Sequence, residues 1–223
     1  METTKMKWEE DLVKDIRLHD ERDDFDYPLG NNKQSFVFYN VLPDFPRWQS
    51  VHDFSKHNQN SLREYFVEKA KNAKCVVEIG VSRDSNKEET STNILLRNKP
   101  KDCVYLGVDL QPKTYLDNDA ENVHTIVVNS SDTETVMQKL NSLGVEEIDF
   151  LMIDGWHSIN QVLDDWEYTK WLSKDGVVAF HDTAYHPGPY LFINNLDTEK
   201  WEVVPNTCKE HIFDFGIGFA WRK

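Results

Sequence analysis

The sequence contains two short motifs in which aspartate stands close to histidine. The first, Asp-Gly-Trp-His, spans residues 154–157, and the second, His-Asp, spans residues 181–182. Each follows an apolar run that is typical of a buried strand, and parallel strands end at the same edge of a sheet. We therefore expect Asp154 and Asp182 to end adjacent strands, with their carboxylates within a few ångströms of each other.

Two converging carboxylates repel each other unless a proton or a cation lies between them. Oxygen-rich sites of this kind suit Mg²⁺ or Mn²⁺, so the pattern predicts a divalent-cation site at Asp154 and Asp182. His157 stands three residues after Asp154. With an unshifted pKa of about 6.5 it could act as a general base. A histidine in such a turn is more often structural, but its place beside the acidic pair favours the functional interpretation.

Polar residues also follow the other apolar runs, at the edge where open α/β sheets bind ligands. Asp109 closes one run about 30 residues beyond Gly80, where a carboxylate can accept hydrogen bonds from both hydroxyls of a ribose. Glu78 lies inside an apolar run, and burying a carboxylate is costly unless it is paired or hydrogen-bonded. That cost favours a functional role for Glu78.

The turn at Gly80 carries one glycine where a dinucleotide fingerprint needs three. The sequence therefore argues against a bound pyrophosphate and against NAD. A cofactor without phosphates, such as S-adenosylmethionine, needs fewer backbone amides around it and fits this turn better.

Five short runs rich in β-branched residues are typical of strands buried on both faces of a parallel sheet. They span residues 75–79, 104–110, 123–128, 148–153 and 177–181. Helical patterns separate them, which predicts a doubly wound sheet. Two further runs, 201–204 and 216–221, leave no room for a crossover helix and should pair antiparallel at one edge. The predicted fold class is α/β, with a Rossmann-like, mostly parallel seven-stranded sheet and an antiparallel C-terminal hairpin.

Serine residues predict where three of the helices begin. Ser61 opens a helix over residues 61–73, Ser131 opens one that stops at Gly144, and Ser158 opens a third. Before residue 61 the pattern is irregular, acidic at first and then aromatic. We therefore divide the chain into an N-terminal appendage, residues 1–60, and a main domain, residues 61–223. The appendage is expected to act as a lid or to form the contact of a homodimer.

Composition excludes several classes of protein. The net charge of −14 disfavours a nucleic-acid partner, because it repels a phosphate backbone. The sequence contains no apolar run of about 18 residues that could span a bilayer. Its first residues lack the order of a secretory signal, so we expect a cytoplasmic protein. The three cysteines, Cys75, Cys103 and Cys208, are far apart and are expected to be reduced thiols.

These motifs together carry a resemblance to a known family. The runs VVEIG, YLGVDL, IDFLMIDGWHS and VLDDWEYTKWLSKDGVVAFHDT lie between about residues 74 and 184. They resemble the class I methyltransferases that include cephalosporin-hydroxylase-like and macrolide-sugar O-methyltransferases (methyltransferase 24-like). The resemblance implies that residues 61–223 are a class I methyltransferase domain with S-adenosyl-L-methionine as cofactor.

The resemblance also implies roles for individual residues. Glu78 and Gly80 would contact the methionine part of the cofactor, Asp109 its ribose, and Asn129 with Ser130 its adenine. The full set implied for cofactor binding is Glu78, Gly80, Val81, Ser82, Asp109, Leu110, Asn129, Ser130 and Asp154. Asp154, His181 and Asp182 would hold Mg²⁺ or another divalent cation. His157 would deprotonate the acceptor hydroxyl. The catalytic residues that the resemblance implies are His157, Asp154 and Asp182.

The function that we predict is metal-assisted O-methylation of a small hydroxylated molecule, either a sugar or a phenol. Substrate choice is assigned to residues 1–60 and to a predicted loop at residues 185–195. The alternative is a methyltransferase-like protein that binds S-adenosylmethionine but has degenerate catalysis or none, an alternative that the single glycine at the turn favours. A nucleic-acid methyltransferase is disfavoured, because the end of the strand before Asp154 reads Ile-Asp-Gly. Base-modifying methyltransferases resemble an Asn/Asp-Pro-Pro-aromatic pattern at this place.

Overall fold

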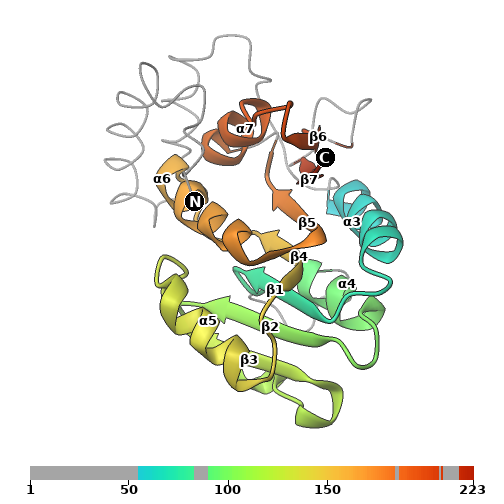
Figure 1. Ribbon diagram of the computed structural model, residues 1–223, viewed down its shortest axis with the longest axis vertical. Coiled ribbons are helices and arrows are strands. Elements are labelled where there is room, and N and C mark those ends of the chain that lie inside the picture. The colour runs from blue at the N-terminus through green and yellow to red at the C-terminus, as the bar shows by residue number, and fades with distance from the viewer. Residues whose placement is uncertain (1–54, 83–89, 184–185, 206, 208–215) are drawn as a thin grey trace.

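The computed structural model describes residues 55–82, 90–183, 186–205, 207 and 216–223. These residues form one seven-stranded sheet with helices packed on both faces (Figure 1). Residues 1–54 and Cys208 lie outside this range. The lid or dimer role of the appendage therefore stays a prediction.

The sheet has the order β3-β2-β1-β4-β5-β7-β6. Strands β1 to β5 run parallel, β7 pairs antiparallel with β5, and β6 pairs antiparallel with β7. The fold class predicted from the sequence is confirmed. The strands are β1 (Cys75–Ile79), β2 (Val104–Asp109), β3 (Val123–Val127), β4 (Ile148–Ile153), β5 (Leu172–His181), β6 (Trp201–Val204) and β7 (Ile217–Arg222).

Strand β5 is longer than the sequence predicted, because it begins at Leu172 and not at residue 177. Ile148 of β4 pairs with Leu172, and the register then shifts before Phe150 pairs with Val177. The extra residues include a polar stretch that is exposed and interrupts the apolar pattern. A strand that bulges in this way cannot be found from its hydrophobic pattern alone.

The helices form one layer on each face of the sheet (Figure 1). Helices α3 and α4 pack on one face, where Phe66, Leu95 and Phe150 belong to one buried cluster. Helices α5, α6 and α7 pack on the other face around Leu140 and Phe180. Their bounds are α3 (Ser55–Lys69), α4 (Ser91–Asn98), α5 (Thr133–Ser142), α6 (Ile159–Trp166) and α7 (Pro187–Asn194), with short 3₁₀ turns at Thr114–Leu116, Asp119–Glu121 and Glu167–Trp171. Among these described helices, none is long and apolar enough to cross a bilayer.

Two of the three predicted helix starts are wrong. Helix α3 begins at Ser55, so Ser61 lies within it. Helix α5 is capped by Asp132, whose carboxylate accepts from Thr135 N at 3.1 Å, because the Ser131 hydroxyl donates to Asp164 instead. The third start is confirmed, since Ser158 caps α6.

The segment 185–195, which we predicted as a loop, contains helix α7 (Pro187–Asn194). Proline often interrupts regular structure, and this segment contains Pro187 and Pro189. However, the first turn of a helix tolerates proline, because the amide that proline lacks would have no partner inside the helix. The helix packs against α6.

Candidate active site

A cavity of about 480 Å³ opens beyond the carboxyl ends of β1, β2, β3 and β4. Helix α6 contributes Gln161 to its wall, and the segment after β5 contributes Asp182 and His186. All the residues that the sequence assigned to the cofactor line this cavity, with the exception of Glu78. The position agrees with the rule that open α/β sheets bind ligands beyond their strand ends.

Gly80 lets two strand ends approach each other at the floor of the cavity. Its φ is +82°, in the left-handed region, and a Cβ atom built on it would lie 2.0 Å from the carbonyl oxygen of Asp154. The neighbouring backbone is held by hydrogen bonds from Gly80 N to Val108 O and from Asp154 N to Ile79 O. Only glycine fits here, because it has no Cβ atom. Asp154 can therefore lie close to the turn after β1.

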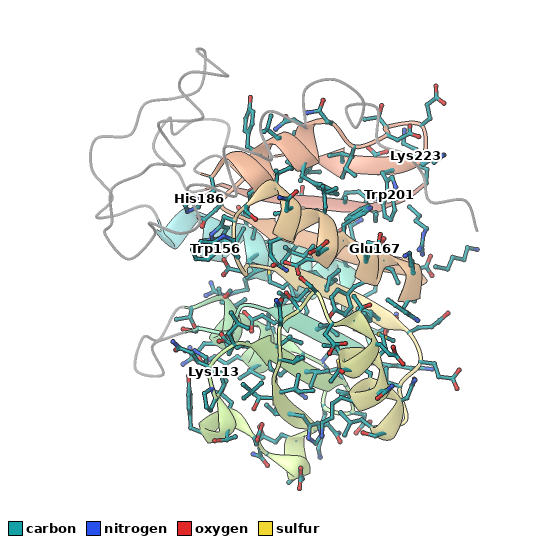
Figure 2. All side chains as sticks on the ribbon, turned by 90° about the vertical axis from the view of Figure 1, so that its left-hand side faces the viewer. Lys113, Trp156, Glu167, His186, Trp201 and Lys223 are labelled. Atoms are coloured by element: carbon teal, nitrogen blue, oxygen red, sulfur yellow. The ribbon has the colours of Figure 1, made fainter. Side chains whose placement is uncertain are left out.

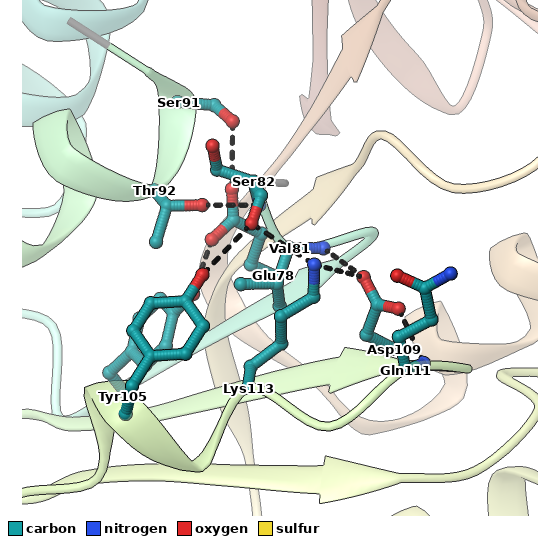
Figure 3. A network of polar contacts seen from close by, with 10 residues as sticks. Glu78, Val81, Ser82, Ser91, Thr92, Tyr105, Asp109, Gln111 and Lys113 are labelled. Carbon is teal, nitrogen blue, oxygen red and sulfur yellow. Dashed lines mark hydrogen bonds and ion pairs between the residues drawn. The ribbon is translucent and has the colours of Figure 1, made fainter. Parts of the chain in front are cut away.

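Glu78 lies beneath the cavity wall and is fully buried. Ser91 Oγ donates to Glu78 Oε1 at 2.9 Å, and the Tyr105 hydroxyl donates to Glu78 Oε2 (Figure 3). Burial raises the pKa of Glu78 to about 7, against the opposing effect of these two hydrogen bonds. Ser91 Oγ also lies 3.4 Å from Asp154 Oδ2, so it connects Glu78 to the acidic end of the cavity.

Asp109 stands at the end of β2 with both carboxylate oxygens engaged. Oδ2 accepts from Val81 N at 3.1 Å, and Oδ1 accepts from Gln111 N at 2.7 Å. Lys113 Nζ lies 3.6 Å from Asp109 Oδ2 and donates to Ser82 O at 3.1 Å (Figure 3). The side chain of Lys113 is only 5% exposed, so its buried ammonium group holds the Asp109 carboxylate in place. The sequence reasoning did not identify Lys113.

The opposite end of the cavity holds a cluster of acids and histidines. The ligand atoms of Asp154, His181 and Asp182 all lie within 4.8 Å of one another, as the two motifs predicted. His181 Nδ1 lies 3.3 Å from Asp154 Oδ1 and 3.0 Å from Asp182 Oδ1. Asp182 also has a φ of 58°, which residues other than glycine rarely adopt. Such backbone strain is concentrated at functional sites.

His157 lies between the two carboxylates, as expected. Its Nε2 is 3.0 Å from Asp182 Oδ2 and 3.6 Å from Asp154 Oδ1. Burial lowers the pKa of His157, but the charges and hydrogen bonds of the two carboxylates outweigh it and raise the pKa to about 9. The expectation of an unshifted pKa near that of free histidine is therefore wrong, because both acids act on the same ring.

His186 completes this end of the cavity, although the sequence reasoning missed it. Its ring stacks on His157 with centroids 4.3 Å apart, and its Nε2 lies 3.6 Å from Asp182 Oδ2. Burial and the positive charge of His157 lower the pKa of His186 to about 3. Figure 2 shows His186 and Trp156 on one edge of the molecule, with Lys113 further along the same edge. The only indication of His186 in the sequence was its position four residues after Asp182.

Comparison with known families identifies the domain that carries this cavity. Residues 77–183 match a family model described as a methyltransferase domain. The match identifies residues 77–183 as a methyltransferase domain. This confirms the family resemblance. The matched stretch runs from β1 to the end of β5 and so contains both ends of the cavity.

Solved structures share the fold of this methyltransferase domain at low sequence identity. The MycE methyltransferase of the mycinamycin pathway, with Mg and SAH, is 15% identical with a TM-score of 0.51, covering 79% of this chain and 51% of that one. The O-methyltransferase TomG from Streptomyces achromogenes, with SAM, is 14% identical with a TM-score of 0.53, covering 99% and 92%. CalS11, a TDP-rhamnose 3'-O-methyltransferase, is 13% identical with a TM-score of 0.54, covering 94% and 93%.

The chain spans only about half the length of MycE, which has a larger polypeptide. No curated protein matches the chain in sequence. At these identities the solved structures establish the fold of the methyltransferase domain.

Proposed function

We propose that the protein transfers a methyl group from S-adenosylmethionine to a hydroxyl oxygen of a small molecule, with the help of a divalent cation. One observation carries this proposal. A single cavity is lined by a ribose-compatible carboxylate, Asp109, at the end of β2 and by Asp154 and Asp182 beside the ends of β4 and β5, and His181 lies next to these two acids.

The cofactor half of the site uses the turns after β1, β2 and β3. Asp109 would accept hydrogen bonds from the ribose hydroxyls, and Lys113 and the amides of Val81 and Gln111 hold its carboxylate in place. Gly80, with Glu78 behind it, would face the methionine part. Asn129 and Ser130 would lie along the adenine, and Val81, Ser82 and Leu110 complete the wall. The sulfonium would then point toward Asp154.

The donor set of Asp154, His181 and Asp182 fits a divalent cation. It combines two carboxylates with one imidazole nitrogen inside a sphere that a metal ion can fill. Mg²⁺ or Mn²⁺ there would acidify the acceptor hydroxyl and orient it toward the methyl group. Without a cation, His157 lies between the two acids and offsets their repulsion, and a bound cation would take over part of that role.

His157 would remove the proton from the acceptor hydroxyl once the cation offsets the carboxylate charges that raise the pKa of its ring to about 9. Its Nε2 lies buried beside both carboxylates, and its ring lines the cavity with 16% of the side chain exposed. His186 stacks on the ring and restricts its rotation. Removal of a general base lowers the rate by about 10² to 10⁴. An unchanged rate in His157→Ala would exclude this role.

The substrate class rests on the size of the site and on the related structures. The cavity of about 480 Å³ suits a cofactor with a small acceptor. MycE and CalS11 are named for acting in mycinamycin biosynthesis and on TDP-rhamnose. These names support a hydroxylated sugar or a phenol as acceptor, and the charge of −14 disfavours nucleic acid.

The test is transfer of a labelled methyl group from S-adenosylmethionine to a panel of sugars and phenols, with Mg²⁺ and with EDTA. We expect transfer that EDTA abolishes and that Asp154→Asn and Asp182→Asn lose. Asp175→Asn, an exposed position on β5, is the matched control and should keep full activity. Calorimetric binding of S-adenosylhomocysteine without transfer to any acceptor would favour a protein that binds the cofactor without catalysis. Full activity in EDTA would refute the role of the cation.

A further inference from the structure

Gln161 of α6 connects the helix to the turn after β3. Its Nε2 contacts three oxygens, Ser130 Oγ at 3.0 Å, Ser131 Oγ at 3.3 Å and Asp165 Oδ1 at 2.9 Å. The side chain is partly buried and lines the cavity next to Ser130. Gln161 was not among the site residues expected from the sequence.

The partners of Gln161 determine which end of its amide faces them. The Ser131 hydroxyl donates its hydrogen to Asp164 Oδ2 at 3.0 Å, so toward Gln161 it can only accept. Asp165 is fully buried, and its ionised carboxylate likewise accepts only. Both neighbours therefore require the NH₂ end of the amide.

The carbonyl end of the same amide faces away from these three oxygens. Within the part of the chain that the structure describes, no donor is bonded to Gln161 Oε1. A polar atom on a cavity wall is expected to be satisfied by water or by a ligand. The partner of a carbonyl oxygen must be an N–H or O–H group.

We infer that Gln161 Oε1 accepts a hydrogen bond from the exocyclic amino group of the cofactor's adenine and so selects a 6-aminopurine over a 6-oxopurine. This rests on the proposed function, in which the base lies along Asn129 and Ser130. A 6-oxopurine would place its own acceptor against Oε1, and neither oxygen carries a hydrogen. Because the NH₂ end is held by Ser131 and Asp165, the amide cannot turn over to relieve that contact.

The expected preference is about 10- to 100-fold, the usual cost of leaving an acceptor unpaired once the bound cofactor excludes water from it. Calorimetric titration of the full chain with S-adenosylhomocysteine and with its deaminated analogue S-inosylhomocysteine measures it. The titration is made at pH 8, since burial raises the pKa of Asp165 to about 7 and its carboxylate must be ionised. Gln161→Met has nearly the same length without the amide, and we expect it to bind the two compounds with equal affinity.

Gln138→Met is the matched control, because Gln138 is exposed on α5 and its amide reaches only Glu134. It should keep the full preference. Equal affinity of the unaltered protein for both compounds would overturn the inference and leave the proposed function intact. A preference that persists in Gln161→Met would overturn it as well. If the unaltered protein binds neither compound, the proposed function fails and the inference with it.

Discussion

Replacement of Gly80 by alanine tests how closely the strand ends must approach. The new Cβ would lie 2.0 Å from Asp154 O, 2.4 Å from Asp154 C and 2.7 Å from Gly155 N. All three are backbone atoms, so no side chain can move aside to make room. The end of β4 must shift, and Asp154 would shift with it.

Two costs add up in Gly80→Ala. A φ of +82° costs about 1–2 kcal/mol for a residue with a Cβ, and overpacking a tight contact costs about 1–3 kcal/mol more. We therefore expect the free energy of unfolding to fall by about 2–5 kcal/mol. Binding of S-adenosylhomocysteine should be lost as well, because the turn and Asp154 form its floor.

Gly144→Ala provides the matched control. Gly144 has a φ of +80°, yet a Cβ built there meets nothing within 4 Å. It should lose only about 1–2 kcal/mol and keep its affinity for S-adenosylhomocysteine. Urea unfolding followed by circular dichroism measures the stabilities, and calorimetry measures the binding. If the two variants lose the same stability and both still bind, the close approach at Gly80 has no consequence and the reasoning is refuted.

Three further predictions concern the supports of the site. Ser158→Ala removes the hydroxyl that accepts from Gln161 N at 3.1 Å at the start of α6 and should lower the free energy of unfolding by about 1 kcal/mol, so an unchanged urea midpoint would contradict it. Lys113→Met leaves Asp109 without its buried cation and should weaken S-adenosylhomocysteine binding about tenfold in calorimetry, whereas unaltered affinity would show that Lys113 does not position the carboxylate. Burial raises the pKa of Asp165 from 3.8 to about 7, so the folded state holds this proton more tightly than the unfolded state and the group's contribution to stability is lost as the pH rises from about 4 to 7. Asp165→Asn lacks this dependence, so its unfolding free energy relative to the unaltered protein should improve between pH 4 and pH 8, and a constant difference would count against the buried charge.

The elements of the central domain were predictable because their signals are local. The apolar runs of β1, β2 and β4 are nearly continuous, as burial on both faces of a sheet demands, and are broken only by Glu78 in β1 and Asp149 in β4. Parallel order then required the residues after β4 and β5 to share one edge. For that reason Asp154, His157, His181 and Asp182 could be grouped before any coordinates were known.

Other features depend on contacts between distant residues, and no local pattern carries them. Asp132 caps α5 because the Ser131 hydroxyl is engaged by α6, and α7 forms in a segment that we predicted as a loop. The raised pKa of His157 requires two carboxylates that approach from different strands. His186 and Gln161 reach the cavity from elements whose faces are set by packing. The amino-acid sequence by itself determined the fold class and the acidic pair. The tertiary structure decided protonation, helix ends and the wall of the site, because those follow from burial and from partners far apart along the chain.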